Sequence, residues 1–359
     1  MNSILQQIKI KFYQYISYRY WEFWPATIFY IPIVLYYILF LIKYRISPTA
    51  ISAVNPCFTF GGMAFDSKFD MISKFFHFPD YVTKTVLIPD NKNRNLDSIR
   101  ILLQENNIHY PFICKPDKGH RGNGFKIIRN QVDLLSYTQV CTRAFLIQEY
   151  IDYPLEYGIF WIKIPTEKKG RITSITRKIL PNLLGNGKSN LAELILSDSR
   201  AKYMANTYFE KNKRNLEKII PLGEKYRICN TGNHCQGAIF EDGLEDIQDK
   251  TLQVLEEICD SVKGYDFGRM DVKFKDKDAL VNGKYFKILE VNGSEAESTH
   301  IYDRKYTFFY AYKTLYQQWN TLFKIAKLNR KNGFYGLTAK RFFSEYIGFI
   351  NENQVIKSD

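Results

Sequence analysis

Residues 265–296, YDFGRMDVKFKDKDALVNGKYFKILEVNGSEA, contain two short runs rich in apolar residues, separated by a polar segment. The runs cover 267–274 and 285–291, and in both of them apolar and polar residues tend to alternate. The polar segment includes an Asn-Gly step at 282–283. Alternation around such a step predicts an antiparallel strand pair joined by a hairpin connection.

One face of this predicted strand pair gathers polar oxygens. If the chain folds back near Leu280, Asp271 faces Glu290. Because strand side chains repeat every second residue, Arg269 and Asn292 share that face. Two carboxylates about 4 Å apart repel by about 4 kcal/mol at an effective dielectric of about 20, so something must offset the repulsion. Oxygen ligands suit a hard cation such as Mg²⁺, held together with nucleotide phosphates. The alternative is an exposed strand pair with scattered charges, which a register slip of one residue would produce.

The composition bounds the class of protein. The chain has 359 residues and a formal net charge of +13, with Lys and Arg spread along its length. This length allows a full catalytic domain with additions. A basic surface attracts phosphates, acidic lipids or other polyanions. We find no zinc-finger, helix-turn-helix or RNA-binding signature, so nucleic acid is not an expected partner. The six cysteines form no C-x-x-C pair and fit reduced thiols in a cytosolic domain.

An uncharged segment lies near the N-terminus. Residues 23–42 carry no charge, and twenty such residues can cross a bilayer. Aromatic residues surround the segment, and Lys43 and Arg45 follow it, as at a membrane interface. Pro25 and Pro32 disfavour a straight helix. A single membrane anchor, a membrane-surface or re-entrant segment and a buried core helix are the three alternatives.

The rest of the chain predicts helices and strands of an α+β protein. Residues 47–66 are rich in Pro, Gly and small residues and indicate a linker or a loop-rich start of the globular part. A helical insert is expected between 185 and 218, capped by Ser189 or Asn190. We expect strands at 81–88, 111–116, 125–129, 144–151, 157–164 and 171–180, and helices at 69–76, 95–107, 132–140, 244–262, 302–328 and 338–349.

A glycine-rich turn follows the strand PFICKP at 111–116. It reads DKGHRGNG at 117–124, with Gly119, Gly122 and Gly124, and leads into the next strand. Such a turn lets backbone N–H groups approach a polyphosphate closely, and Lys115 would add a point charge. A plain flexible hairpin tip is the alternative. The spacing is not that of a Walker loop.

Two acidic residues accompany the apolar strand AFLIQEYI at 144–151. Glu149 lies near the end of the strand, and Glu156 follows shortly after it. Carboxylates in these positions could hydrogen-bond the adenine and ribose of a nucleotide. Taken singly, each is also compatible with a solvated loop residue.

In combination, these segments resemble the ATP-grasp superfamily of carboxylate–amine ligases over residues 68–303. The hairpin resembles the magnesium hairpin of the D-alanine–D-alanine ligase branch, and 185–195 is similar to a stretch of cyanophycin-synthetase-like ligases. The matching pieces are GRMDV (268–272) with ILEVN (288–292), PFICKP with GHRGNG (119–124), LIQEYI (146–151) and GNGKSNLAELI (185–195).

The resemblance implies an ATP-grasp fold, in which two α+β subdomains clasp ATP behind an N-terminal hydrophobic helix. The cofactors would be ATP and one or two Mg²⁺ ions, with Asp271, Glu290 and Asn292 as metal ligands and Arg269 at the reacting centre. The residues expected to bind ATP are Lys68, Lys115, Gly119, Gly122, Gly124, Glu149, Tyr150, Ile151, Glu156 and Lys178. The expected divisions are a membrane-associating segment (1–46), a linker and preceding region (47–107), the ATP-grasp domain (108–328) and a basic C-terminal helix and tail (329–359).

The implied activity is formation of an amide bond between a carboxylate donor and an amine acceptor through an acyl phosphate. Phosphoryl transfer to a carboxylate brings two anions together, which Mg²⁺ and Lys or Arg must neutralise. We expect a membrane-associated protein, attached through 23–42, with a cytoplasmic catalytic domain. A kinase that phosphorylates a hydroxyl and a non-catalytic, membrane-associated nucleotide-binding adaptor are the alternatives.

The run after the predicted metal ligands departs from the family pattern. D-alanine ligases continue with a Pro-Gly-Met-Thr-like run that holds the second amino acid, whereas residues 293–300 read GSEAESTH. This difference argues against D-alanyl-D-alanine as the product. Glu295 and Glu297 could attract an amine or polyamine, and His300 could assist proton removal. A charged loop leading into a helix is the alternative.

Overall fold

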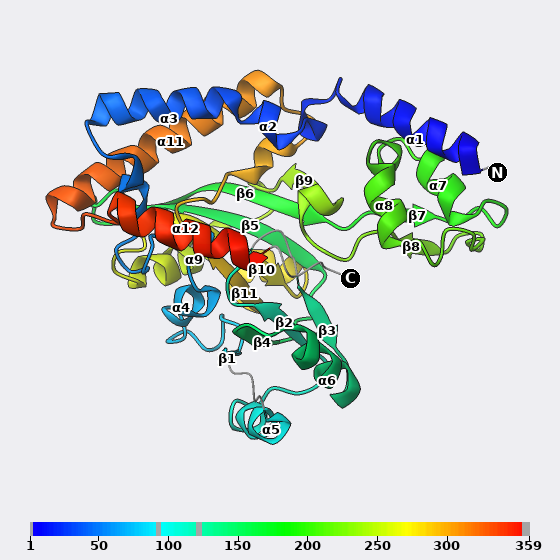
Figure 1. The fold of residues 1–359 in the computed structure, drawn as a ribbon, viewed down its shortest axis with the longest axis horizontal. Coiled ribbons are helices and arrows are strands. Elements are labelled where there is room, and N and C mark those ends of the chain that lie inside the picture. The colour runs from blue at the N-terminus through cyan, green and yellow to red at the C-terminus, as the bar shows by residue number, and fades with distance from the viewer. Residues whose placement is uncertain (1–2, 91–94, 120–123, 354–359) are drawn as a thin grey trace.

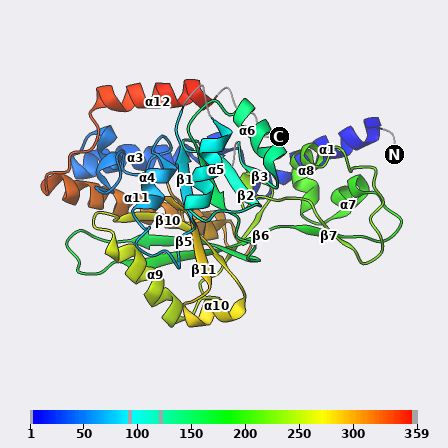
Figure 2. The ribbon, with the colours of Figure 1, turned by 90° about the horizontal axis from the view of Figure 1, so that it is seen from below.

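Two antiparallel β-sheets form the body of the protein (Figures 1 and 2). The structure is a computed structural model that describes residues 3–90, 95–119 and 124–353. The first sheet has four strands in the order β1-β4-β2-β3, and the second has five in the order β11-β10-β5-β6-β9. The expected α+β class is therefore confirmed.

The four-stranded sheet is covered by helices on one face only. Alternate residues of β2 and β4, such as Phe112 and Phe145, are buried against α5 (Leu96–Glu105) and α6 (Gln131–Val140). The opposite face turns Lys115 and Gln148 toward the second sheet, where both side chains reach a backbone carbonyl of β11. The strands are β1 (Thr85–Ile88), β2 (Phe112–Pro116), β3 (Lys126–Ile128) and β4 (Phe145–Glu149).

The five-stranded sheet is buried on both faces along part of its length. Tyr157, Ile159 and Trp161 pack in one core with residues of α4 (Lys68–Ser73), α9 (Asp249–Ser261) and α10 (Lys277–Asn282). Phe160 and Ile162 point the other way, toward α11 (Phe308–Lys331). The strands are β5 (Leu155–Ile162), β6 (Arg171–Ile179), β9 (Ile239–Asp242), β10 (Phe267–Phe274) and β11 (Phe286–Asn292).

The pairing of β10 with β11 has the predicted register. Asp271 is opposite Glu290, and Arg269 is opposite Asn292. The connection differs from the expected hairpin turn, because helix α10 joins the two strands. The glycine of the Asn-Gly step, Gly283, ends this helix in a left-handed conformation with φ of +67°.

A small insert projects between β6 and β9 (Figure 1, right). Asn190 caps α7 (Leu191–Ser197) in a capping box with Glu193, which confirms one of the two predicted caps. Between 185 and 218 the insert is helical, as expected, with α7, a 3₁₀ helix (Ala201–Met204) and α8 (Ala205–Lys211). A two-stranded sheet flanks this helical part and pairs β7 (Asn182–Leu184) with β8 (Lys225–Arg227).

The N-terminal residues form α1 (Ser3–Ser17), α2 (Ala26–Phe29) and α3 (Ile31–Tyr44). Pro32 lies in the first turn of α3, where proline is tolerated, so it starts the helix rather than bending it. Within the described residues, one helical stretch, 26–44, is long and apolar enough to span a membrane. By length and composition alone, the helix of a soluble protein could pass the same test.

The segment that follows is part of the body and not a free linker. Residues 48–53 form a buried 3₁₀ helix, and the buried Asn55 side chain binds the backbone of β10 and the residue before it. Of the two readings of 47–66, the loop-rich start of the globular part is thus the one found. Helix α12 (Ala339–Asn353) follows α11 and packs Phe349 near Phe65.

A buried carboxylate beside this segment gives a prediction about stability. Burial raises the pKa of Asp266 to about 6 from 3.8, although Asn329 donates a hydrogen bond to it. Between these values the native state holds more protons than the unfolded state, so stability falls as the pH rises from about 4 to about 6. We expect Asp266→Asn to raise the free energy of unfolding at pH 7.5 by up to about 3 kcal/mol.

The measurement is thermal unfolding of both proteins at pH 4 and at pH 7.5. The gain should be present at the higher pH and largely absent at the lower. Asp97→Asn, at a side chain that is 76% exposed, is the control and should change little at either pH. An equal effect of Asp266→Asn at both values would contradict the assignment.

Candidate active site

Charged side chains from three neighbouring strands meet on one face of the five-stranded sheet. Asp271 on β10 lies between two cations. Its Oδ2 is 2.8 Å from Lys178 Nζ on β6, and its Oδ1 is 3.1 Å from Arg269 Nε on its own strand. Lys178 Nζ is also 3.1 Å from Glu156 Oε1 on β5. The alternation of β10 places Met270 and Val272 on the opposite face, in the core.

A glycine makes this meeting of side chains possible. Gly158 on β5 pairs with Asp271 on one side and with Thr176 on the other. A Cβ at Gly158 would lie 3.1 Å from Arg269 Cδ and 3.7 Å from Asp271 Oδ1. The missing side chain therefore leaves room for the guanidinium of Arg269 beside the carboxylate. Nothing in the sequence pattern of β5 indicated this role.

Gly158→Val should disturb the site more than the fold. Its methyl groups would push the Arg269 side chain away from Asp271, and overpacking of this kind costs about 1–3 kcal/mol of stability. With Arg269 at the reacting centre, as the resemblance implies, we expect turnover to fall at least about tenfold, since a small misplacement of such a group is costly. Gly158→Ala should give an intermediate loss. Turnover like that of the unmodified protein in the valine variant would contradict this role.

The pKa shifts agree with a set of fixed charges. Burial by itself would raise the pKa of Asp271, but Lys178 and Arg269 outweigh it and the pKa is lowered. Burial would likewise lower the pKa of Lys178, yet Asp271 and Glu156 raise it. The pKa of Arg269 is also raised, because its acidic neighbours outweigh burial. All three groups are therefore charged at neutral pH.

The other two predicted metal ligands leave their oxygens available. Glu290 and Asn292 lie on β11 opposite Asp271 and Arg269. No hydrogen bond or ion pair joins either side chain to another described residue. In the described part of the chain, no three His, Cys, Asp or Glu side chains come together as a metal site. Among the predicted site residues, the two carboxylates of Asp271 and Glu290 and the amide of Asn292 are thus the only candidate metal ligands.

Two lysines approach Glu290 from outside its sheet. Lys68 opens α4, and its ammonium group donates to the carbonyl of Gly119. Burial lowers the pKa of Lys68, while the nearby Glu290 raises it and Lys115 lowers it further. Lys115 Nζ lies 3.5 Å from the carbonyl oxygen of Leu289. The predicted phosphate contacts Lys68 and Lys115 are therefore close to the predicted metal ligands, whereas Lys178 is held by Asp271 and Glu156.

A β-bulge brings the two sheets into contact. The register of β10 against β11 shifts between Asp271 and Val272, so Leu289 lies outside the regular pairing. Its carbonyl accepts a hydrogen bond from Gln148 Nε2 at 3.0 Å as well as from Lys115. Gln148 was not predicted as a site residue. The signal that could have found it is a polar side chain within an apolar strand, on the same face as Leu146.

The glycine-rich turn is described only in part. Gly124 has φ of +71°, and its carbonyl accepts a hydrogen bond from Tyr137 at 2.9 Å. Gly119 has φ of +147°. Gly122 lies outside the described residues. The strands on either side of the turn, β2 and β3, pair in the antiparallel manner expected.

The predicted adenine segment lies at the end of β4. The Glu149 carboxylate accepts a hydrogen bond from the backbone N–H of Lys84 at 2.8 Å. The carbonyl of Ile151 accepts one from Lys273 Nζ at 2.9 Å. Lys273 was missed, although it follows Arg269 and Asp271 at the two-residue spacing of one strand face. Tyr150 lines a cavity of about 340 Å³ together with Tyr110, Pro111, Ile127 and Arg129.

The loop after β11 brings further groups close to Arg269. Glu297 accepts a hydrogen bond from the Tyr30 hydroxyl at 2.8 Å, and its backbone carbonyl accepts one from Arg269 at 3.4 Å. Burial raises the pKa of Glu297, against the opposing effects of Tyr30 and Arg269. Tyr30 was not predicted, because no local pattern links residues so far apart in sequence.

The other two residues of this loop are engaged in the fold. The Glu295 carboxylate accepts a hydrogen bond from the backbone N–H of Ala64 at 2.9 Å. His300 Nδ1 lies 2.6 Å from Ser174 Oγ, and its Nε2 lies 3.1 Å from the Tyr310 hydroxyl. Both ring nitrogens of His300 are thus hydrogen-bonded to hydroxyl groups of the fold.

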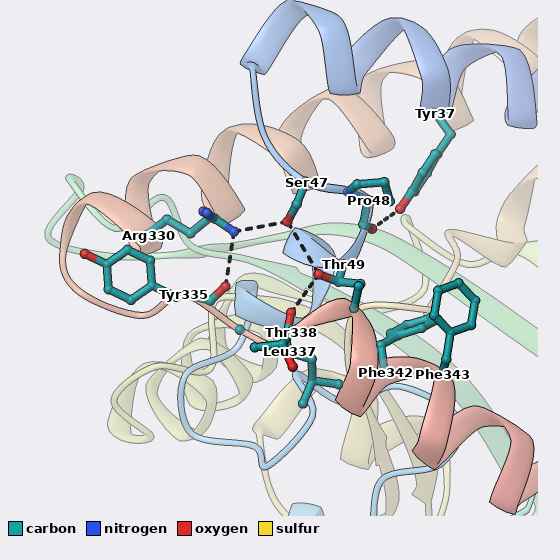
Figure 3. A pocket seen from close by; sticks show the side chains of 12 residues that line it. Tyr37, Ser47, Pro48, Thr49, Arg330, Tyr335, Leu337, Thr338, Phe342 and Phe343 are labelled. Atoms are coloured by element: carbon teal, nitrogen blue, oxygen red, sulfur yellow. Dashed lines mark hydrogen bonds between the residues drawn. The ribbon is translucent and has the colours of Figure 1, made fainter.

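A larger cavity, of about 430 Å³, lies elsewhere in the molecule (Figure 3). It opens between α3, the segment after it and the C-terminal residues. Tyr37, Arg330 and Phe342 are among its lining residues, and none of the predicted site residues is. The cavity therefore plays no part in the chemistry considered below.

Comparison with known proteins gives matches along the sequence. The profile of the tubulin-tyrosine ligase family matches residues 62–158. Cyanophycin synthetase from Synechocystis sp. is 22% identical over 214 residues, which cover 54% of this chain and 24% of that protein. The chain thus spans about a quarter of the length of this curated relative.

Solved structures give further likenesses. D-alanine–D-alanine ligase from Bacillus anthracis has a TM-score of 0.43 at 12% identity, over 74% of this chain and 69% of that one. A bifunctional glutathione synthetase from Pasteurella multocida has a TM-score of 0.39 at 13% identity, over 70% and 36%. Both TM-scores lie below 0.5.

The profile covers two of the sequence motifs, PFICKP with the turn after it and LIQEYI. The cyanophycin synthetase match extends over 54% of the chain. The resemblance of this chain to carboxylate–amine ligases of the cyanophycin-synthetase kind, predicted from the sequence motifs, is thereby confirmed as a resemblance.

Proposed function

We propose that this chain is an ATP- and Mg²⁺-dependent ligase that joins a carboxylate to an amine through an acyl phosphate. The observation that carries the proposal is the pairing of Asp271 with Glu290 on a sheet face that Lys68 and Lys115 approach. Negative oxygens for a cation and positive groups for phosphates thus lie side by side. This combination is what transfer of a phosphoryl group between anions requires.

Asp271, Glu290 and Asn292 would hold the magnesium. The unpaired oxygens of Glu290 and Asn292 fit a hard cation, and each carboxylate oxygen of Asp271 keeps a lone pair beyond its present ion pair. When bound, Mg²⁺ would neutralise charge on the terminal phosphates. The positive charges of Lys178 and Arg269 hold Asp271 ionised before any cation arrives.

The nucleotide would lie between the two sheets. Lys115 and Lys68 would contact its phosphates, together with the backbone at Gly119 and Gly124. The segment Glu149–Tyr150–Ile151 would bind adenine through its backbone, and Glu156 would accept from the ribose. Lys178 would act mainly through Asp271, because both of its ion pairs are to site carboxylates.

The reaction would proceed in two steps. A carboxylate oxygen of the donor attacks the γ-phosphorus of ATP, and ADP leaves. The amine then attacks the carbonyl carbon, and collapse of the oxyanion expels orthophosphate while the amine nitrogen loses a proton. Arg269 would stabilise the oxyanion, a role typically worth about 3–4 kcal/mol. Glu297, next to Arg269, is a candidate contact for the acceptor amine.

We further propose that the protein associates with a membrane through residues 23–42 and that its catalytic part, 108–328, faces the cytoplasm. The apolar stretch 26–44 and the six free cysteines support this arrangement. Residues 47–107 would lead into the catalytic part, and 329–359 would form a basic C-terminal extension.

The test is a screen of amino acids and cell-envelope metabolites for substrate-dependent release of phosphate, with Asp271→Asn as the blank. A ligase yields ADP, orthophosphate and an amide. With an ¹⁸O-labelled carboxylate donor, one ¹⁸O atom should appear in the orthophosphate. ADP with a stable phosphoester would instead indicate a kinase, and tight ATP binding without turnover would indicate an adaptor.

A further inference from the structure

Helix α3 leaves a stripe of aliphatic side chains uncovered. Ile31, Val34, Leu35, Ile38, Leu39 and Ile42 are between 48% and 70% exposed. Their three- and four-residue spacing places them on one side of the helix. A continuous apolar stripe of this length on a protein surface marks a site of contact with a membrane or with another protein.

The opposite side of α3 is fixed to the body of the protein. Its aromatic rings pack against α11, with centroid distances of 5.0 Å for Tyr36–Tyr316 and 5.5 Å for Phe40–Phe323. Phe323 is itself part of the core between α11 and the five-stranded sheet. For α3 to cross a bilayer, it would have to leave this core or take α11 with it. The packing therefore favours a helix that lies along a membrane surface.

Helix α1 carries a second stripe of the same kind. Leu5, Ile8, Phe12 and Tyr15 are between 51% and 77% exposed, while Ile10 and Tyr13 on the other side pack against the insert. Figure 1 shows α1, α2 and α3 in a row along one edge of the molecule. Since the other side of each long helix contacts the protein below it, the two stripes point outward from that edge.

The charges around this edge are almost all positive. Residues 1–65 contain five Lys or Arg and one acid, Glu22. The Glu22 side chain is 6% exposed and is bound by Arg200 at 2.6 Å, so it adds no negative charge to the surface. Residues 304–344, which include α11, contain nine Lys or Arg and no Asp or Glu.

Basic groups lie at the C-terminal end of the α3 stripe and beside the residues that precede α2. Lys43 and Lys327 both lie near the Tyr44 ring at its C-terminal end. Arg304 lies 3.5 Å from Glu22, which precedes α2. An apolar helix face with Lys and Arg around it is typical of helices that lie in the interface of an anionic bilayer.

We propose that α1 and α3 dock in the plane of an anionic lipid bilayer, with their aliphatic stripes in the boundary between headgroups and acyl chains. The inference rests on the membrane association proposed above and specifies its mode, its lipid and its residues. It adds α1, which the uncharged segment 23–42 does not include. It does not depend on the ligase chemistry.

The experiment is flotation of the full-length protein with vesicles. One set contains phosphatidylcholine only, and the other contains phosphatidylcholine with phosphatidylglycerol. We expect binding to the anionic vesicles, weaker binding to the neutral ones, and release by alkaline carbonate. Leu35→Glu and Leu39→Glu should each lower the partition coefficient at least about tenfold, since burying a leucine is worth about 1.5–3 kcal/mol.

A matched control exists on the far side of the molecule. Ile101 on α5 is 56% exposed, like Leu35 at 57% and Leu39 at 56%, and α5 lies at the opposite edge in Figure 1. Ile101→Glu should float like the unmodified protein. Asp271→Asn should do the same, so loss of ligase activity and loss of membrane binding can be told apart.

Three results would overturn the proposal. Failure to bind either kind of vesicle, for example because a stable dimer covers the stripes, would assign the stripes to protein contacts. Equal binding to both kinds would refute the role of the basic residues. Retention of the protein in the vesicles after carbonate treatment would mean that the helix spans the bilayer.

Discussion

Asp271→Asn is expected to reduce substrate-dependent formation of ADP at least about a thousandfold, because it removes both a proposed metal ligand and the partner of two site cations. It should also lower stability. Lys178 is 3% exposed and would keep only Glu156 as an ion-pair partner. Breaking a buried pair of this kind costs about 3–5 kcal/mol. Steady-state kinetics and thermal unfolding measure the two effects.

The matched control uses another ion pair on the same sheet. Arg177 on β6 lies 2.7 Å from Glu241 on β9, and both side chains are more than one third exposed, at 41% and 37%. Glu241→Gln should leave turnover unchanged and cost less than about 1 kcal/mol, as is usual for exposed pairs. If Asp271→Asn were no more harmful than this control, Asp271 would be a structural residue and not a catalytic one.

Arg269→Lys should lower kcat at least about a hundredfold while leaving the KM for ATP nearly unchanged. Lysine keeps the positive charge but loses the planar fork that contacts both the Asp271 carboxylate and the carbonyl of Glu297. Since the guanidinium is proposed to stabilise an oxyanion that forms only after ADP does, its loss should affect the chemical step.

Arg177→Lys is the control for this second substitution, since Arg177 lies on β6 of the same sheet and its ion pairs are to acids outside the site. It should keep kcat close to that of the unmodified protein. A rise in the KM for ATP without a fall in kcat in Arg269→Lys would mean that Arg269 binds nucleotide instead of acting on the acyl group.

The sequence predicted the central strand pair because its information is local. The alternation in β10 and β11 determines which side chains share a face, and the Asp271–Glu290 register followed from the spacing of two apolar runs. The connection was misjudged, since six residues between the strands form α10 where a turn was expected. An Asn-Gly step ends a helix as readily as it makes a hairpin turn, because both use a left-handed residue.

Contacts between distant segments were beyond prediction. Tyr30 reaches Glu297 across 267 positions, and Gly158 matters only because Arg269 packs over it on the next strand. Lys178 was expected at the phosphates, but its two ion pairs depend on the order of β6, β5 and β10 in the sheet. Sheet order is a property of the tertiary fold, and the motifs of single strands do not contain it.

Calorimetric titration with a non-hydrolysable ATP analogue tests the central claim most directly, because it needs no knowledge of the donor or acceptor. We expect the unmodified protein to bind the analogue much more tightly with Mg²⁺ than with EDTA. Glu290→Gln should remove most of that difference, since it converts one of two carboxylates into an amide. Equal affinity with Mg²⁺ and with EDTA in the unmodified protein would contradict a metal–nucleotide site at Asp271, Glu290 and Asn292.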